Sequence, residues 1–211
     1  MKMSEHVVKR TTDRTKVRTM AQVAMLGAVA TVLMALDFPI PFLAPPFYQM
    51  DLSEIPVLVG AFAMGPMAGV AIEFLKVVLH MLLQGTTTAG VGDLANFLVG
   101  CSYMIPAAMI YRTKKTRGRA LAGLGVGTVS MVLVGCVMNA FVLLPAYAAA
   151  FQVPVQSFID MGAEINPAIN SLFRFCLLAV GPFNLVKGLL TAAVTLIIYK
   201  KISILLKGNL E

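Results

Sequence analysis

Lys187 places a charged ammonium group inside a long apolar stretch, residues 171–199. The nearest cations along the chain, Arg174 and Lys200, are each thirteen residues away, or about 20 Å along a helix. A lysine side chain cannot reach water across that distance, and an isolated charge at the centre of a bilayer costs at least about 2.5–3.5 kcal/mol. Lys187 is therefore expected to face a partner or a polar cavity. Asn184 shares its helix face, and the pair predicts the floor of a polar site.

A second amide, Asn139, is predicted at a similar depth. It follows Arg119 by twenty residues, about 30 Å of helix, and Asn184 precedes Lys200 by sixteen residues, about 24 Å. Amides both donate and accept hydrogen bonds, and an ammonium donates three. Together these groups could recognise the carbonyls, imides and hydroxyls of a small heterocycle or polyol. The alternative is that the amides join neighbouring helices. For Asn139 both interpretations stay open, whereas the depth of Asn184 and Lys187 favours a ligand site.

Glu73, Lys76 and His80 form a polar stripe at helical spacing. One interpretation is a proton relay; the favoured one is an internal ion pair with a hydrogen-bonded histidine. Enzymatic motifs such as GxSxG, HExxH and the nucleotide P-loop are absent from the sequence. The three cysteines lie in apolar segments without the spacing of a metal site or of a disulfide framework. No catalytic residue, metal site or cofactor is therefore expected.

The composition predicts an integral membrane protein. Hydrophobic residues make up 58% of the 211-residue chain and charged residues only 13%, about half the share in soluble domains. The net charge is +7, but the lysines and arginines gather in three clusters, in residues 1–18, 112–119 and 200–207. Clusters at separate points along an apolar chain are typical of cytoplasmic loops. Nucleic-acid binding is therefore not expected, and the partner of this surface is the lipid bilayer.

The fold class predicted is an all-α integral membrane protein with six transmembrane helices. Both termini and the 112–119 loop face the cytoplasm only if residues 55–83 are broken at Gly65-Pro66. We divide the chain into a basic cytoplasmic tail, 1–17, a membrane domain, 18–200, and a cytoplasmic C-terminal tail, 201–211. The expected spans are residues 18–36, 53–65, 66–83, 91–111, 120–144 and 171–199.

The second of these spans is short: between Ser53, a plausible N-cap, and Gly65 it has only about 11 residues, or 16 Å, against a bilayer core of about 30 Å. The preceding loop, residues 37–51, contains four prolines that forbid a regular helix. Irregular backbone at membrane depth is tolerated only inside protein or along a cavity. We therefore predict that this first extracellular loop folds inward over the site. Residues 146–170 are expected to form a long outer connection, and the loop 86–96 either a gate or a simple turn.

Ala24 and Ala28 place two small residues one turn apart on the first helix. Such a face allows another helix to approach closely. The partner could be a second protein or a helix of the same chain, and the spacing alone leaves both open.

Four strings resemble the riboflavin-specific S component of energy-coupling factor (ECF) transporters: DLSEIP (51–56), GPMAGVAIEFLK (65–76), GTTTAGVGDLANF (85–97) and PFNLVKG (182–188). The resemblance covers nearly the whole chain from the first helix onward. It implies a six-helix protein of the bacterial cell membrane that captures a vitamin from outside. The implied partners are a membrane coupling subunit and two ATPase subunits, which supply the energy. Riboflavin is then a transported ligand rather than a cofactor.

The resemblance also assigns residues. Asn139, Asn184 and Lys187 match positions that contact the flavin, and Ala24 and Ala28 match the face that docks on the coupling subunit. Tyr48 and Gln49 of the first loop are expected to close over the ligand. The substrate-binding set predicted from the sequence is Tyr48, Gln49, Thr87, Asn96, Asn139, Asn184 and Lys187.

Two other functions are carried forward as alternatives. One is an S component for a different vitamin, with the same fold and partners. The other belongs to a different class: an integral membrane enzyme that uses Lys187 or His80 as an acid or base.

Overall fold

A computed structural model describes residues 2–86 and 90–207, with the side chains of 16–86 and 90–198. Long helices dominate this part of the chain, and the β-structure is one antiparallel pair of two-residue strands, with Phe38 opposite Met50. In chain order the elements are α1 (Lys2–Met34), β1 (Phe38–Pro39), β2 (Gln49–Met50), α2 (Glu54–Met64), α3 (Pro66–Gln84), α4 (Val91–Thr113), α5 (Arg117–Met138), the π-helical η1 (Asn139–Leu143), α6 (Leu144–Phe151), α7 (Val155–Ile165), α8 (Leu172–Phe175), the π-helical η2 (Cys176–Val180) and α9 (Gly181–Lys207).

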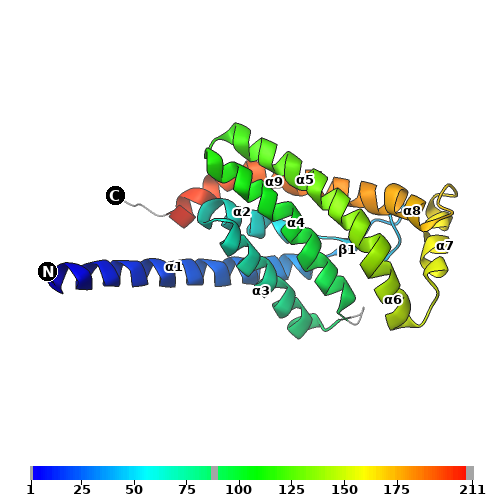
Figure 1. The fold of residues 1–211 in the computed structure, drawn as a ribbon, viewed down its shortest axis with the longest axis horizontal. Coiled ribbons are helices and arrows are strands. Elements are labelled where there is room, and N and C mark those ends of the chain that lie inside the picture. Colours follow the sequence, from blue (N-terminus) through cyan, green and yellow to red (C-terminus); the bar gives the residue numbers. More distant parts are fainter. Residues whose placement is uncertain (1, 87–89, 208–211) are drawn as a thin grey trace.

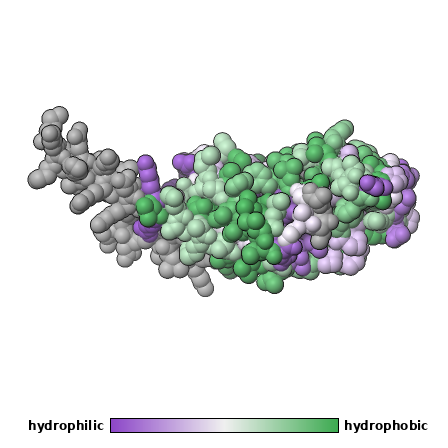
Figure 2. Space-filling view, turned by 90° about the horizontal axis from the view of Figure 1, so that it is seen from below, coloured by the Kyte–Doolittle hydropathy of each residue, from purple (hydrophilic) through white to green (hydrophobic). Residues whose placement is uncertain are grey.

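Five helical stretches of the described chain are long and apolar enough to cross a membrane: 16–34, 66–84, 91–113, 117–151 and 172–198. Many large apolar side chains on them point outward, including Leu133 and Phe141. Figure 2 shows hydrophobic residues covering the middle of one face, with hydrophilic residues gathered toward both ends. The chain is thus an all-helical membrane protein, as expected.

The predicted break at Gly65-Pro66 is confirmed. Helix α2 ends at Met64 and α3 begins at Pro66, and Gly65 between them has φ 111°, which favours glycine. Helix α2 has 11 residues, the length expected from the sequence. It lies inside the bundle, in contact with α1, α3, α4 and α9, and nine of its residues are buried.

Residues 146–170 differ from the plain connection expected. Helix α5 continues through η1 and α6 to Phe151, and a separate amphipathic helix, α7, follows. The buried face of α7, with Phe158 and Ile159, packs in one apolar cluster with Phe175. The sequence interpretation missed α7 because its apolar stripe is only three turns long.

Both ends of the described chain lie at one end of the molecule, and α6, α7 and α8 lie at the other (Figure 1). The terminal segments are helical further than the sequence suggested. Helix α1 begins at Lys2, inside the predicted 1–17 tail, and α9 continues past Lys200 to Lys207.

Candidate functional site

A cavity of about 340 Å³ opens among the ends of α1, α3 and α4, the β2 strand, and α5, η1 and α9. These are the helix ends away from the chain termini (Figure 1). Its size is within the range of small-molecule sites, roughly 300–1,000 Å³. Six residues of the substrate-binding set predicted from the sequence line it: Tyr48, Gln49, Asn96, Asn139, Asn184 and Lys187. The seventh, Thr87, lies outside the described residues.

Lys187 finds its partner in Asp51, the residue between β2 and α2. The Lys187 Nζ donates to Asp51 Oδ2 at 2.7 Å, and both side chains are buried. The backbone N–H and the hydroxyl of Ser53 donate to the other carboxylate oxygen. Burial alone would raise the pKa of Asp51, but the charges of Lys187 and Lys76, with the hydrogen bonds from Lys187 and Ser53, lower it to about 2. The carboxylate form of Asp51 is therefore favoured at neutral pH. Asp51 precedes Lys187 by 136 residues, and no periodicity in the sequence connects them.

Asn139 and Asn184 face the same cavity from two helices. Each amide nitrogen donates to a carbonyl of its own helix, Asn139 to Gly135 at 2.8 Å and Asn184 to Val180 at 2.9 Å. Tyr48 donates its hydroxyl to the Asn139 oxygen. The first loop is therefore tied directly to η1, the continuation of α5.

Two π-helical turns lie next to these amides. One begins at Asn139, and the other ends at Val180, four residues before Asn184. π-Helical turns shift the helix face that follows them and recur at functional sites. The sequence interpretation did not predict them; in the structure the two turns are in contact with each other.

Aromatic rings form an apolar wall around the polar groups. Phe47, Tyr48, Tyr147 and Phe183 line the cavity. The ring of Tyr48 lies 4.6 Å from Phe47 and 5.5 Å from Phe183, centroid to centroid. A wall of this kind suits a flat ligand, because aromatic rings stack in offset or tilted arrangements.

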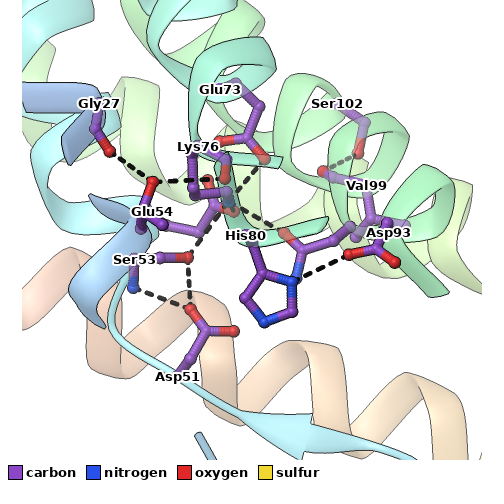
Figure 3. Close-up of polar contacts among 12 residues, drawn as sticks. Gly27, Asp51, Ser53, Glu54, Glu73, Lys76, His80, Asp93, Val99 and Ser102 are labelled. Carbon is purple, nitrogen blue, oxygen red and sulfur yellow. Dashed lines mark hydrogen bonds and ion pairs between the residues drawn. The ribbon is translucent and has the colours of Figure 1, made fainter. Parts of the chain in front are cut away.

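Below the cavity, the ammonium of Lys76 lies close to four oxygen atoms. Its Nζ lies 2.9 Å from Glu54 Oε1, 2.6 Å from Glu73 Oε1, 3.1 Å from Ser53 Oγ and 2.9 Å from Asn96 Oδ1. Lys76, Glu54 and Glu73 are almost completely buried, and Figure 3 shows their side chains converging. Asn96 therefore lines the cavity with an oxygen that already accepts from Lys76.

His80 points away from this group and pairs with Asp93 of α4, Nδ1 to Oδ1 at 3.0 Å (Figure 3). The favoured interpretation of the 73–76–80 stripe, an internal ion pair with a hydrogen-bonded histidine, is confirmed. Sequence reasoning missed the acids that complete it, Glu54 of α2 and Asp93 of α4. The only feature of the sequence that distinguished these two acids was their position in the first turn of a predicted helix.

The two small residues of α1 lie away from the cavity. Ala24 and Ala28 are exposed, whereas the intervening Gly27 faces Leu75 of α3. Within the described structure, the packing of α1 against α3 uses Gly27 and leaves the alanine face open.

Comparison with known proteins gives consistent matches over most of the chain. The family described as "ECF transporter, substrate-specific component" matches residues 18–199. "Riboflavin transporter RibU" of Staphylococcus aureus (strain TCH60) is 34% identical over 185 residues, covering 88% of this chain and 90% of that protein. "Riboflavin transporter FmnP" of Bacillus subtilis (strain 168) is 31% identical over 189 residues, covering 89% and 93%. A solved structure titled "Structure and mechanism of the S component of a bacterial ECF transporter" superposes with a TM-score of 0.70 at 31% identity, covering 92% of this chain and 99% of that one.

Proposed function

Because this chain belongs to the substrate-specific components of ECF transporters, we propose that it captures riboflavin in the cavity around Lys187 for uptake across a bacterial membrane. It is a multi-pass membrane protein of a transporter family and not an enzyme. The alternative of a membrane enzyme using Lys187 or His80 is therefore set aside. Both side chains are also already engaged by carboxylates, Asp51 and Asp93. The observation that carries the proposal is the agreement between the riboflavin-transporter relatives and a cavity that combines aromatic and polar walls.

Riboflavin has a flat ring system with a carbonyl and imide edge, and a chain of hydroxyls. In our proposal the aromatic wall of the cavity packs on the ring. Asn139, Asn184 and Lys187 form hydrogen bonds with the carbonyl and imide groups at the edge of the ring. The ammonium of Lys187 has three protons, of which Asp51 takes one. The remaining two are available for ligand carbonyls. Tyr48 and Gln49 close over the ligand and Asn96 adds a polar contact, while Thr87 remains an expectation from the resemblance.

For the topology we propose six membrane segments, with the short α2 as the second. The termini and the 112–119 loop then face the cytoplasm, as the positive clusters favour. The described ends of the chain lie together at one end of the bundle (Figure 1), which agrees with an even number of segments. On this topology the first loop enters from outside and covers the site. The burial of Ala44 and Met50 and the contact of Tyr48 with Asn139 support it.

The experiment that tests the function is purification in detergent from cells grown with riboflavin. The protein should carry the yellow absorbance of the flavin and, once stripped, should quench the fluorescence of added riboflavin in a saturable titration. Parallel titrations with thiamine and biotin test the alternative of an S component for another vitamin. Binding of one of these in place of riboflavin would overturn the proposed substrate and leave the family assignment intact.

For the partners, we propose that the face of Ala24 and Ala28 docks on the coupling subunit of a complex that also contains two ATPases. Ala24→Trp should lower riboflavin uptake by cells that carry the complete complex, because the indole prevents close helix approach. It should leave the affinity of the purified protein unchanged, since Ala24 is remote from the cavity.

Leu133→Trp is the matched control for this variant, because it places the same indole at an exposed position of α5. Normal uptake with Ala24→Trp, or equal losses with both variants, would reject the docking face.

A further inference from the structure

The buried polar cluster beneath the cavity contains more acids than bases. The chain of contacts runs from Lys187 to Asp51, through Ser53 to Lys76, and ends at Glu54 and Glu73. All five charged members have side chains no more than 7% exposed. With every member ionised, three carboxylates face two ammonium groups, and the cluster carries one uncompensated negative charge.

Among the residues that the structure describes, no further lysine or arginine forms an ion pair with the cluster. On α4, the titratable groups next to the glutamates are the neutral Cys101 and Tyr103. His80 is already paired with Asp93. Asp37, half-buried at the cavity edge, adds another acid. On α1, the charged side chains within the described part, Lys16 and Arg18, lie at the far end of the helix, while Thr31 bonds to backbone carbonyls.

Two carboxylate oxygens in the cluster lack the partners that a charged group would need. Within the described residues, Glu54 Oε2 and Glu73 Oε2 have no hydrogen-bond partner, although both glutamates are buried. Glu73 Oε1 is close to Lys76 but outside hydrogen-bond alignment. A buried ionised carboxylate with unsatisfied oxygens is strongly unfavourable, and such groups become neutral by binding a proton.

The carboxyl groups of Glu54 and Glu73 meet at the same point on α4. Gly100 lies against both carboxyl groups: a Cβ there would sit 2.7 Å from Glu54 Oε1 and would also overlap Glu73 Oε1. Both of these oxygens also contact the same ammonium, that of Lys76. The two carboxyl groups are thus close neighbours beside one ammonium, so a charge on one disfavours a charge on the other.

We propose that this cluster is a proton-binding site, in which Glu54 and Glu73 together hold one proton at neutral pH. The proton adds to one carboxylate oxygen and gives a neutral carboxylic acid, so that the cluster has two negative and two positive groups. Glu54 lines the cavity and Glu73 does not, so the proton enters from water through Glu54. The proposal is independent of which vitamin the cavity takes.

Infrared spectroscopy of the full chain in lipid vesicles tests the site. The wild type at neutral pH should show the C=O stretch of a buried protonated carboxyl, which shifts down in D₂O. Glu73→Gln and Glu54→Gln should each abolish it, because either change removes the surplus acid and leaves two carboxylates facing two ammonium groups. Asp93→Asn, which changes an acid outside the cluster, should leave the band in place.

The wild type gives a second test that needs no variant. Raising the pH should remove the same band as the shared proton is lost. A wild type without the band would overturn the proposal, as would a band that survives in both glutamine variants or is lost in Asp93→Asn. If one glutamine variant fails to fold, the other and the alkaline titration still decide the outcome.

Discussion

Lys187→Ala is expected to weaken riboflavin binding by about 10- to 150-fold. The proposed contact is a hydrogen bond from a charged donor in a desolvated cavity, worth about 1.5–3 kcal/mol, and each 1.4 kcal/mol is about a factor of ten in affinity. Truncation also releases Asp51 from its ion pair at 2.7 Å, which leaves a buried carboxylate facing the ligand carbonyls. Fluorescence-quenching titration of the purified protein measures the change.

A double variant shows whether Lys187 contacts the ligand or only stabilises the fold. Lys187→Ala alone should also lower stability, because it leaves Asp51 without its cation. Combining Lys187→Met with Asp51→Asn removes both charges, so stability should largely return while affinity stays low. Lys114→Ala, at an exposed position in the 112–119 cluster, is the control and should change neither. If Lys187→Ala binds riboflavin like the wild type, the ammonium is not a ligand contact.

The features predicted correctly from the sequence were those governed by position along one helix. Depth arithmetic for Lys187, Asn184 and Asn139 needed only the rise per residue, and all three line one cavity. The break at Gly65-Pro66 followed from backbone chemistry and from the charge clusters, and α2 and α3 meet there. Such inferences need only the residues of one segment, or the thickness of the bilayer, which is the same for every helix.

The features that were missed depend on contacts between distant segments. Asp51 sits in a proline-rich stretch with no periodicity, so nothing in the sequence indicates that it reaches Lys187. Glu54 joins Lys76 only because the break at Gly65 turns α2 back against α3. Asn96 lines the cavity as predicted, but the hydrogen bond that its oxygen accepts from Lys76 was not foreseen. Predicting these pairs requires the rotation of each helix about its axis, which a single sequence does not provide.

The same cross-segment contacts explain why the polar site can exist inside a membrane protein. A buried cation is tolerated when its protons are accepted, and the acceptors come from different elements. Lys187 of α9 uses the segment before α2, while Lys76 of α3 uses α2 and α4. Ser53 contacts both Asp51 and Lys76, so the two ion pairs are joined. The start of α2 is thereby held against three helices, and the first loop ends at this fixed point.

Lys76→Met tests that role directly and is expected to destabilise the protein by about 3–5 kcal/mol, the cost of removing one partner from a buried ion pair. Methionine fills much of the same volume, so packing loss contributes little. The variant leaves Glu54 without its cation and removes the donor to Asn96 and Ser53. Denaturant unfolding in detergent, followed by circular dichroism, measures the shift against the wild type.

The compensating variant decides whether charge is the cause. Lys76→Met combined with Glu54→Gln removes one positive and one negative group. The cluster then keeps the same excess of one acid as in the wild type, so much of the stability should return. Lys114→Met, the same change at an exposed lysine, should leave the unfolding midpoint unchanged. A Lys76→Met protein as stable as the wild type would mean that the ion pairs at Lys76 do not hold α2, α3 and α4 together. Equal instability of the single and double variants would instead assign the loss to packing around the lysine stem.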